Sequence, residues 1–381
     1  SAKQQAKLFD DDKEQVKLTA GIMWHKVERQ TDEMGLKAEL TTFVPYTQDK
    51  VELTKVTITN TADTTQKITN TSDQPQTITS TVAIPMYARS ASNIRDHRHV
   101  TSLLHRTFTV KNGIMIYPTL TFDERGHNKN TVFYGALAKE MINGKMESPF
   151  SFCPVTEEFI GEGGNFENPY YVAKNKPLPY TEGQEVDGYE TVAAIRFNDC
   201  ELKPGESRSY VIALEYGTSK EELESIGNKY IDVDVFDKYL SNDSIKDFME
   251  SIRNAKKIID FAKNKNFDNW MHWVNFQPML RRIYGCSFLP HHDYGKGGRG
   301  WRDLWQDCLA LLIMEPEQVR QMLIDNFGGV RFDGTNATII GSKQGEFIAD
   351  RNNITRVWMD HGAWPYLTTE LYMQQTGDVE F

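Results

Sequence analysis

The stretch RRIYGCSFLPHHDYGKGGRGWRDLWQDCLALLIM, residues 281–314, decides the fold of the second half of the chain. Its first part is rich in glycine and predicts a loop, and the apolar spacing from Trp301 onward predicts a helix. A rotation of about 100° per residue places the polar side chains of this helix within an arc of roughly 140°. These side chains are Arg302, Asp303, Gln306 and Asp307. Because the later turns are apolar all round, the pattern predicts a buried helix with a polar N-terminal end.

The polar end of this helix combines residue types that suit a polyhydroxylated ligand. A guanidinium group donates two parallel hydrogen bonds, carboxylates accept hydroxyl protons, and indole rings stack on the C–H face of a sugar. Arg302 and Asp307 are the strongest candidates, whereas Trp301 and Trp305 point mainly to the apolar side, which favours core packing. An Arg–Asp pair that only closes the start of the helix explains the same residues, so both interpretations stay open.

The length, net charge and composition of the chain exclude several classes of partner. The chain has 381 residues, enough for two domains, and a net charge of −10. Nucleic acids and anionic membrane surfaces both require clustered Lys and Arg, so we expect neither as a partner. No apolar run approaches the roughly 20 residues of a membrane span, and no signal-peptide core is present, so we expect a cytoplasmic protein. Four cysteines stand far apart without a CxxC pair, which indicates free thiols and no metal site.

Residues 1–217 predict an antiparallel β-sandwich. Apolar and polar residues alternate in short runs that turn signals separate, as in sandwich strands. The expected strands are residues 36–44, 51–58, 78–84, 107–110, 115–120, 132–136, 192–198 and 209–216. The segment KPGE, residues 203–206, predicts a turn before the last of them. The echo of ITNTAD (58–63) in ITNTSD (68–73) predicts one extra hairpin.

Residues 218–266 predict a helical linker, and residues 267–381 predict the first part of an all-α domain. The expected helices cover residues 220–229, 235–264, 269–284, 301–314, 317–327 and 364–375, with a hairpin at 330–346. Pro316 suits the first turn of a helix, and Gly377 ends the last one. Three helices and part of a fourth cannot bury their apolar faces alone, so we expect this chain to be one piece of something larger.

Four segments resemble one known family. GWRDLWQD, residues 300–307, resembles the G-[FW]-R-D-x-x-Q-D signature of the inverting disaccharide and oligosaccharide phosphorylases, glycoside hydrolase family 94 and its relatives. Three further matches occur in the same order along the chain. They are VP (44–45) with VTITNT (56–61), EFIG (158–161) with Pro169, and DHGAWP (360–365) with TGD (376–378).

The resemblance implies a multidomain β and α architecture. It consists of an N-terminal β-sandwich, a helical linker and an (α/α)6 barrel, in the order that the periodicity predicts, with only the start of the barrel in this chain. The general acid of the family is an aspartate in a D-W-[ND]-D segment, which is expected beyond Phe381, so the catalytic residue stays unknown here. A departure is His361, which stands where the family has the second aspartate of a D-D pair.

The activity that the resemblance implies is phosphorolysis of β-glucosidic bonds with inversion, which releases α-glucose 1-phosphate. Inorganic phosphate is then the co-substrate and no other cofactor is needed. Because phosphate is already an anionic nucleophile, one general acid and a cationic phosphate site suffice. The amino-acid sequence of residues 297–307 favours an oligoglucan substrate over cellobiose. Whether the glucan is β-1,2-, β-1,3- or β-1,4-linked stays open. The expected assembly is a homodimer, or an association with a chain that carries the rest of the barrel.

The resemblance assigns the counterparts of Arg302 and Asp307 to the subsite of the glucosyl unit at the cleavage point. Asp303 stands in the first turn, where the positive end of the helix favours a carboxylate. It is expected to support that subsite without touching the sugar, and direct contact with the substrate is the alternative. Asp360 and His361 either contact the substrate, or precede a helix as a cap in which Asp360 accepts from the first free N–H groups.

Three more residues come from the glycine-rich loop. Arg299, His291 and His292 are candidates for contacts with phosphate or an acceptor sugar. A surface arginine and a hydrogen-bonded histidine pair are the alternatives. Two other classes of function also stay open: a non-catalytic carbohydrate-binding or scaffold protein, and a phosphate-independent glycoside hydrolase of the same superfamily.

Overall fold

The computed structural model describes residues 15–21, 23–31, 35–61, 76–88, 105–119, 130–241, 266–267, 270–271, 273–274, 277, 299–314, 316–340, 346–348 and 359–381. The chain divides into two compact units. One consists of Ser1–Ser90 and Asp96–Lys246, and the other of Ala91–Arg95 and Asp247–Phe381.

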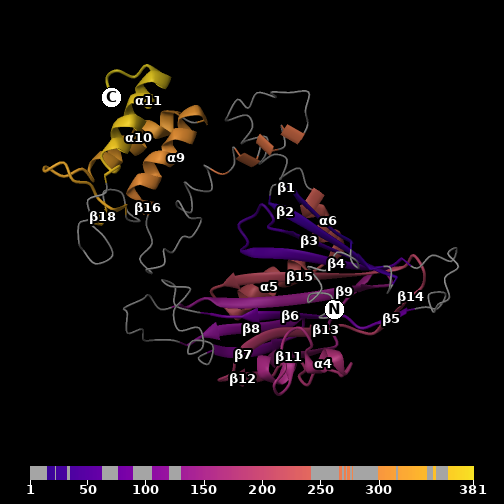
Figure 1. Cartoon of the computed structure of the whole chain (residues 1–381). Helices are drawn as coiled ribbons and strands as arrows, with labels where there is room; N and C mark the ends of the chain where they lie inside the picture. The colour runs from indigo at the N-terminus through magenta and orange to yellow at the C-terminus, as the bar shows by residue number, and fades with distance from the viewer. Residues whose placement is uncertain are drawn as a thin grey trace. The chain divides into compact units, whose positions relative to one another are not determined.

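The centre of the first unit is an antiparallel sheet with ten described strands (Figure 1). Along the sheet these are β1 (Gln15–Gly21), β2 (Trp24–Thr31), β3 (Leu36–Phe43), β4 (Val51–Asn60), β15 (Ser207–Gly217), β9 (Phe133–Ile142), β8 (Gly113–Pro118), β7 (His105–Val110) and β12 (Glu185–Asp187), with β10 (Lys145–Glu147) paired to β9. β15 carries buried apolar residues on both of its faces. Both faces of the sheet must therefore be covered by other elements.

One face of this sheet packs on a second sheet, in the order β11 (Ser151–Val155), β13 (Thr191–Arg196) and β6 (Thr81–Met86). Ile114, Tyr210 and Ile212 of the large sheet form a core with Phe152 and Ile195 of the small one. Behind the small sheet lie α3 (Thr156–Ile160) and α4 (Tyr170–Ala173). A separate pair of strands, β14 (Cys200–Leu202) and β5 (Gln76–Ile78), completes the unit.

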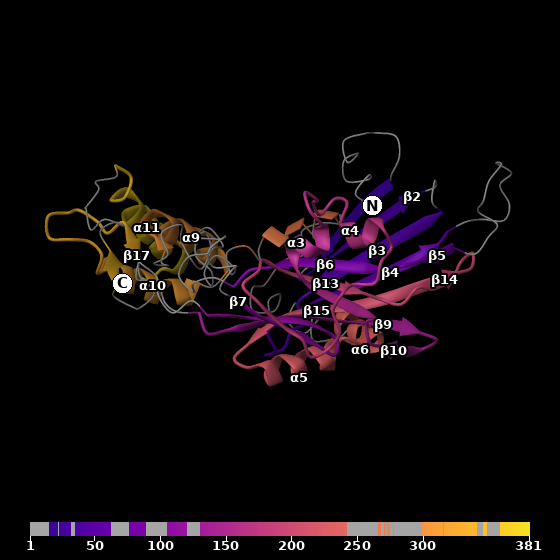
Figure 2. The same cartoon turned by 90° about the horizontal axis from the view of Figure 1, so that it is seen from below.

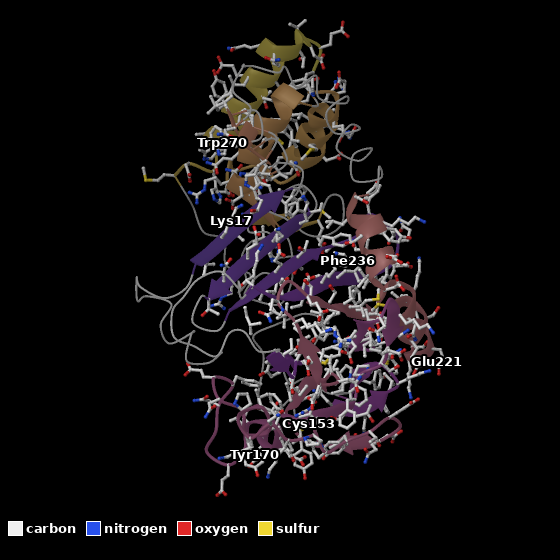
Figure 3. The ribbon with its side chains drawn as sticks, turned by 90° about the vertical axis from the view of Figure 1, so that its right-hand side faces the viewer. Lys17, Cys153, Tyr170, Glu221, Phe236 and Trp270 are labelled. Carbon is white, nitrogen blue, oxygen red and sulfur yellow. The ribbon has the colours of Figure 1, made fainter. Side chains whose placement is uncertain are left out.

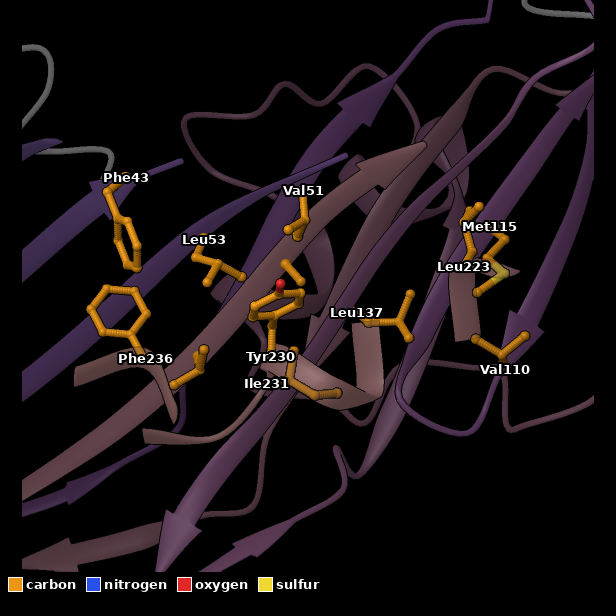
Figure 4. Packing of buried hydrophobic residues seen from close by; sticks show 12 residues of the cluster. Phe43, Val51, Leu53, Val110, Met115, Leu137, Leu223, Tyr230, Ile231 and Phe236 are labelled. Carbon is orange, nitrogen blue, oxygen red and sulfur yellow. The ribbon is translucent and has the colours of Figure 1, made fainter. Parts of the chain in front are cut away.

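The other face of the large sheet is covered by α5 (Lys220–Tyr230) and α6 (Val233–Ser241), as Figure 2 shows. Figure 4 shows their packing: Leu223 and Tyr230 of α5 and Phe236 of α6 belong to one apolar cluster with Leu53 and Leu137 of the sheet. The first unit is therefore layered as helices, large sheet, small sheet and short helices.

A cap at the start of α5 gives a test of this layer. Ser219 Oγ accepts a hydrogen bond from the Glu222 backbone N–H at 3.1 Å. Replacing Ser219 by alanine is expected to lower the free energy of unfolding of the first unit by about 1 kcal/mol, because one helical N–H loses its partner. Urea unfolding monitored by circular dichroism measures this change. Ser225→Ala, on an exposed position of the same helix, should stay within about 0.5 kcal/mol of the natural protein.

The predicted strands between residues 36 and 216 are confirmed as β3, β4, β6, β7, β8, β9, β13 and β15, with ends that differ. The turn at residues 203–206 is also confirmed, because Glu206 N–H donates to Lys203 O at 2.9 Å. β1, β2, β11 and the short β10, β12 and β14 were not predicted. The echo at residues 68–73 lies outside the described residues.

In the second unit, α9 (Trp301–Met314), α10 (Pro316–Phe327) and α11 (Ala363–Thr376) confirm three predicted helices. Trp301, Trp305 and Leu323 form their common core with Tyr372. Gly377, at a φ of 72°, ends α11 in the left-handed conformation as expected. The predicted helix at 235–264 begins as α6, while its later part and most of the predicted helix at 269–284 lie outside the described residues.

The predicted hairpin at residues 330–346 is shorter in the structure. Val330 bridges Asn336, and Gly334 N–H donates to Arg331 O at 2.9 Å around the tight turn. The following strand β17 (Ile339–Ile340) pairs instead with β16 (Arg299–Gly300) and β18 (Phe347–Ile348). These pairings bring Arg299 and Gly300, directly before α9, beside the segment after α10.

The fold confirms the antiparallel β-sandwich of the N-terminal part. The assignment of residues 267–381 to an (α/α)6 barrel, and the boundaries at 217 and 266, stay predictions. Three of the four cysteines are described: Cys153 (Figure 3), Cys200 and Cys308 are buried free thiols. Within the described ranges, no helix has both the length and the apolar character to cross a membrane.

Candidate functional site

The candidate site is centred on an ion pair between the start of α9 and the segment before α11. Arg302 Nη1 donates to Asp360 Oδ2 at 3.0 Å across 58 residues of sequence. Both side chains are open to solvent, with 46% of Arg302 and 41% of Asp360 exposed. The GWRD and DHGAWP segments, which the sequence analysis singled out separately, therefore meet here.

Two further bonds fix Asp360. Its Oδ2 also accepts from Trp364 Nε1 at 3.2 Å, and its backbone carbonyl accepts from the N–H groups of Ala363 and Trp364. The hydrogen bond from Arg302, and then that from Trp364, hold the pKa of Asp360 below its usual value. Asp360 therefore does accept from the first N–H groups of the helix, through its backbone carbonyl.

His361 belongs to the core beside this pair. Its carbonyl accepts from Trp301 Nε1 at 3.0 Å, and its side chain is buried. Burial lowers the pKa of His361, the charge of Asp360 opposes this shift, and a bond with the Ala337 backbone also raises it. The imidazole is therefore neutral near pH 7, and His361 positions the segment that carries Asp360.

Asp303 turns back toward the start of α9. A Cβ placed on Gly300 would lie 2.1 Å from Asp303 Oδ2, so the carboxylate stands directly against the glycine backbone. A carboxylate in the first turn is stabilised by the free N–H groups there. Its negative charge also contributes to the raised pKa of Arg302, after the larger effect of Asp360. This position agrees with a supporting role.

Asp307 is buried, unlike Arg302 on the same helix. Only 5% of Asp307 is exposed, whereas Arg302 is open, so the two side chains do not share one exposed face. Trp301 and Trp305 are fully buried with ring centroids 5.5 Å apart, which confirms the preference for core packing. Arg302 pairs with Asp360, and the substrate-binding role of Arg302 and Asp307 stays a prediction.

The remaining candidates contribute less. Arg299 lies in β16, where its backbone pairs with Ile340. His291 and His292 lie outside the described residues. Among the described residues, no three His, Cys, Asp or Glu side chains come together as a metal site would require. Sequence reasoning gave no role to Trp364, although its spacing of four from Asp360 at a helix start predicts such a contact.

A groove of about 560 Å³ lies next to this site. The outer face of α11 and the turn after α10 form its walls. It is lined by Phe327, Val330, Gly334, Asn336, Gly362, Pro365, Tyr366, Thr369, Glu370, Met373 and Gln374. Arg302 and Asp360 are not among these residues, so the ion pair and the groove are separate features.

Chemically, the ion pair offers a donor and an acceptor side by side. The guanidinium has N–H groups to spare beyond the one that Asp360 takes, and the carboxylate has a second oxygen. A hydroxyl group both donates and accepts, so this pair suits neighbouring hydroxyls of one ligand. Neither group changes its charge near pH 7, and the pair alone supplies no proton.

The fold of the chain has counterparts among solved structures. The chain is similar in structure to a bacterial glucoamylase complexed with acarbose, with a TM-score of 0.51 and 9% identity over 95% of this chain and 48% of that one. It is also similar to a "putative kojibiose phosphorylase" from the human microbiome, with a TM-score of 0.46 and 8% identity over 94% and 42%. The chain thus spans about half the length of these structures or less.

Residues 12–233 match the supersandwich domain of glycosyl hydrolase 94. The chain belongs to this family, as the four sequence segments predicted. No curated protein sequence matches the chain.

Proposed function

We propose that this chain is the N-terminal part of an enzyme that cleaves β-glucosidic bonds of oligoglucans with inorganic phosphate. The products are α-glucose 1-phosphate, with inverted anomeric configuration, and a shortened glucan. The observation that supports this proposal best is the exposed Arg302–Asp360 pair. It unites two segments that resemble those of the phosphorylases, in a chain that belongs to glycosyl hydrolase 94.

The pair holds the glucosyl unit in this proposal. Arg302 donates to a ring hydroxyl, and Asp360 accepts from its neighbour with a carboxylate that stays ionised because its pKa is low. Trp364 keeps Asp360 in place through its indole N–H. The negative charge of Asp303 favours the cationic form of Arg302. Asp307, which is buried, supports the helix and does not touch the sugar in this scheme.

The rest of the mechanism follows from the nucleophile. Phosphate carries its own negative charge, so a second carboxylate to activate water is unnecessary and would repel it. One general acid protonates the leaving oxygen, and no residue of this chain is assigned to that role. Arg299 is a candidate for the phosphate or the acceptor sugar. We further propose a cytoplasmic homodimer with phosphate as co-substrate and no other cofactor.

The test uses the full-length protein that contains this chain. It is incubated with α-glucose 1-phosphate and β-1,2-, β-1,3- or β-1,4-linked oligoglucans, and released phosphate is measured. We expect phosphate release with at least one acceptor and elongation of that glucan. If no acceptor yields phosphate, the proposal is wrong.

The same assay distinguishes the two alternatives. A hydrolase releases reducing sugar from oligoglucan when phosphate is absent, which agrees with the name of the family. A carbohydrate-binding or scaffold protein binds the glucan, for example in calorimetry, and consumes neither substrate.

A further inference from the structure

A buried glutamate lies between the large sheet and α5. β15 alternates, and Val211, Ala213 and Glu215 point to the face that α5 and α6 cover. Figure 4 shows this face, on which Leu223 of α5 lies beside the sheet. Glu215 is thus a carboxyl group at a position where the alternation of the strand calls for an apolar side chain.

The surroundings of Glu215 are apolar and tight. Only 4% of the residue is exposed, and neither Oε1 nor Oε2 has a hydrogen-bond partner among the described residues. A Cβ on Gly135 of β9 would lie 3.0 Å from Oε1, and one on Gly227 of α5 would lie 2.7 Å from it. The two glycines therefore leave the space that the carboxyl group fills, and the helix rests directly on it.

Hydrogen bonds hold α5 near both of its ends, on either side of this carboxyl group. At its start, Glu222 accepts from Thr218 N–H at 2.7 Å. In its last turn, Asn228 Oδ1 accepts from Asn112 Nδ2 at 2.6 Å. At its end, Asp49 accepts from Tyr230 OH at 2.7 Å and from Lys229 Nζ at 2.6 Å. These bonds fix the helix at the edge of the contact, and Glu215 lies under its middle.

The charged groups near this contact are engaged elsewhere. On α5, Glu222 binds Thr218, Lys229 binds Asp49, and Lys220 lies over the ring of Phe108. On the sheet, Lys55 of β4 pairs with Asp237 of α6, and Lys139 of β9 faces Val211, four residues from Glu215 along β15. Burial is the sole cause that raises the pKa of Glu215, to about 8. No neighbouring charge stabilises its ionised form.

We propose that Glu215 is a proton-operated lock for α5: the protonated carboxyl group lets the helix pack on the sheet, and loss of the proton loosens it. An unpaired charge in an apolar contact is costly, and the helix can relieve that cost by moving away so that water reaches the carboxylate. The docked state then depends on pH within the range in which cells work.

The direction of the pH dependence follows from the raised pKa of Glu215. The docked state binds the proton more tightly than the undocked state, in which the pKa is near the ordinary value of 4.5. The stabilisation is fully present below about pH 4.5, and it is lost as the pH rises through about 8. Docking of α5 therefore weakens from acid to mildly alkaline pH.

Hydrogen exchange in the complete chain measures this docking. The protection factors of the α5 amides, corrected for the intrinsic pH dependence of exchange, are expected to fall about 50-fold between pH 6 and pH 8. The amides of β13, in the other sheet, serve as an internal reference and should keep their protection. Glu215→Gln, which cannot ionise, should make the protection of α5 independent of pH.

Glu221→Gln is the matched control, because Glu221 stands exposed on the same helix (Figure 3) and should leave the pH dependence unchanged. A second variant, Glu215→Leu, should protect α5 better than the natural protein at pH 9. A flat profile of the natural protein, or a drop that persists in Glu215→Gln, overturns the proposal. So does failure of both Glu215 variants to fold at pH 6, because the carboxyl group would then be required in another role.

Discussion

Replacing Arg302 by alanine in the full-length protein is expected to lower kcat/KM for oligoglucan phosphorolysis by about 10- to 100-fold. The reason is the loss of a charge-assisted donor to a sugar hydroxyl, and with it the partner that orients Asp360. The free energy of unfolding should change by less than about 1 kcal/mol, since the pair is exposed and screened by water. Initial rates of phosphate release and a urea titration measure the two quantities.

The second unit contains a matched control for this variant. Arg320 Nε donates to Asp378 Oδ2 at 2.7 Å, also across 58 residues, and 43% of the Arg320 side chain is exposed. Arg320→Ala removes an equivalent ion pair away from the candidate site, so kcat/KM should stay within about threefold of the natural value. Equal losses of activity in both variants would contradict the assignment of Arg302 to the substrate.

Replacing Trp301 by alanine is expected to lower the stability of the second unit by about 3–5 kcal/mol. Trp301 is fully buried and contacts the rings of Trp305 and Phe347. Its indole N–H also holds the carbonyl of His361 at 3.0 Å. The substitution therefore opens a cavity and leaves a buried acceptor without this donor. Hydrogen exchange of the α9 amides measures the loss.

Phenylalanine variants separate packing from hydrogen bonding. Trp301→Phe keeps an aromatic ring and loses the bond to His361, and should cost about 1–3 kcal/mol for that bond alone. Trp305 is equally buried, but its indole N–H has no hydrogen-bond partner within the described ranges. Trp305→Phe should therefore be the milder change, and a larger loss in Trp305→Phe than in Trp301→Phe would refute this account.

Sequence periodicity predicted the strands that have one apolar and one polar face. It did not predict strands that are stabilised mainly by side chains of the adjacent strand. β2 carries Lys26 and Glu28, and it is held by ion pairs at 3.0 Å from Lys26 to Glu39 and from Lys37 to Glu28. Such pairs arise only once β2 and β3 lie side by side, so one segment alone does not reveal them. β11 contains Pro154, which argues against a strand, and the structure accommodates it by a register shift between Cys153 and Val155.

The helix at the start of the candidate site was predictable to its end residues, because glycines precede Trp301 and Pro316 follows Met314. The partner of Arg302 was not. Helix geometry considers residues within one segment and placed Asp307 on the same polar face as Arg302, whereas the burial of Asp307 and the contact to Asp360 depend on how α9 packs on α11. The same limit applies to Glu215, whose place in an alternating strand was visible but whose cover by α5 was not.

In the proposed function, the Arg302–Asp360 bond has a consequence for which ligands bind. Any ligand that inserts between the two groups must replace a charge-assisted hydrogen bond of 3.0 Å, and part of its binding free energy is spent on that exchange. A molecule with a hydroxyl for each partner restores both contacts, whereas one that lacks a hydroxyl leaves one charge unsatisfied. The pair thus discriminates between a sugar and its deoxy analogue more strongly than its net contribution to affinity indicates.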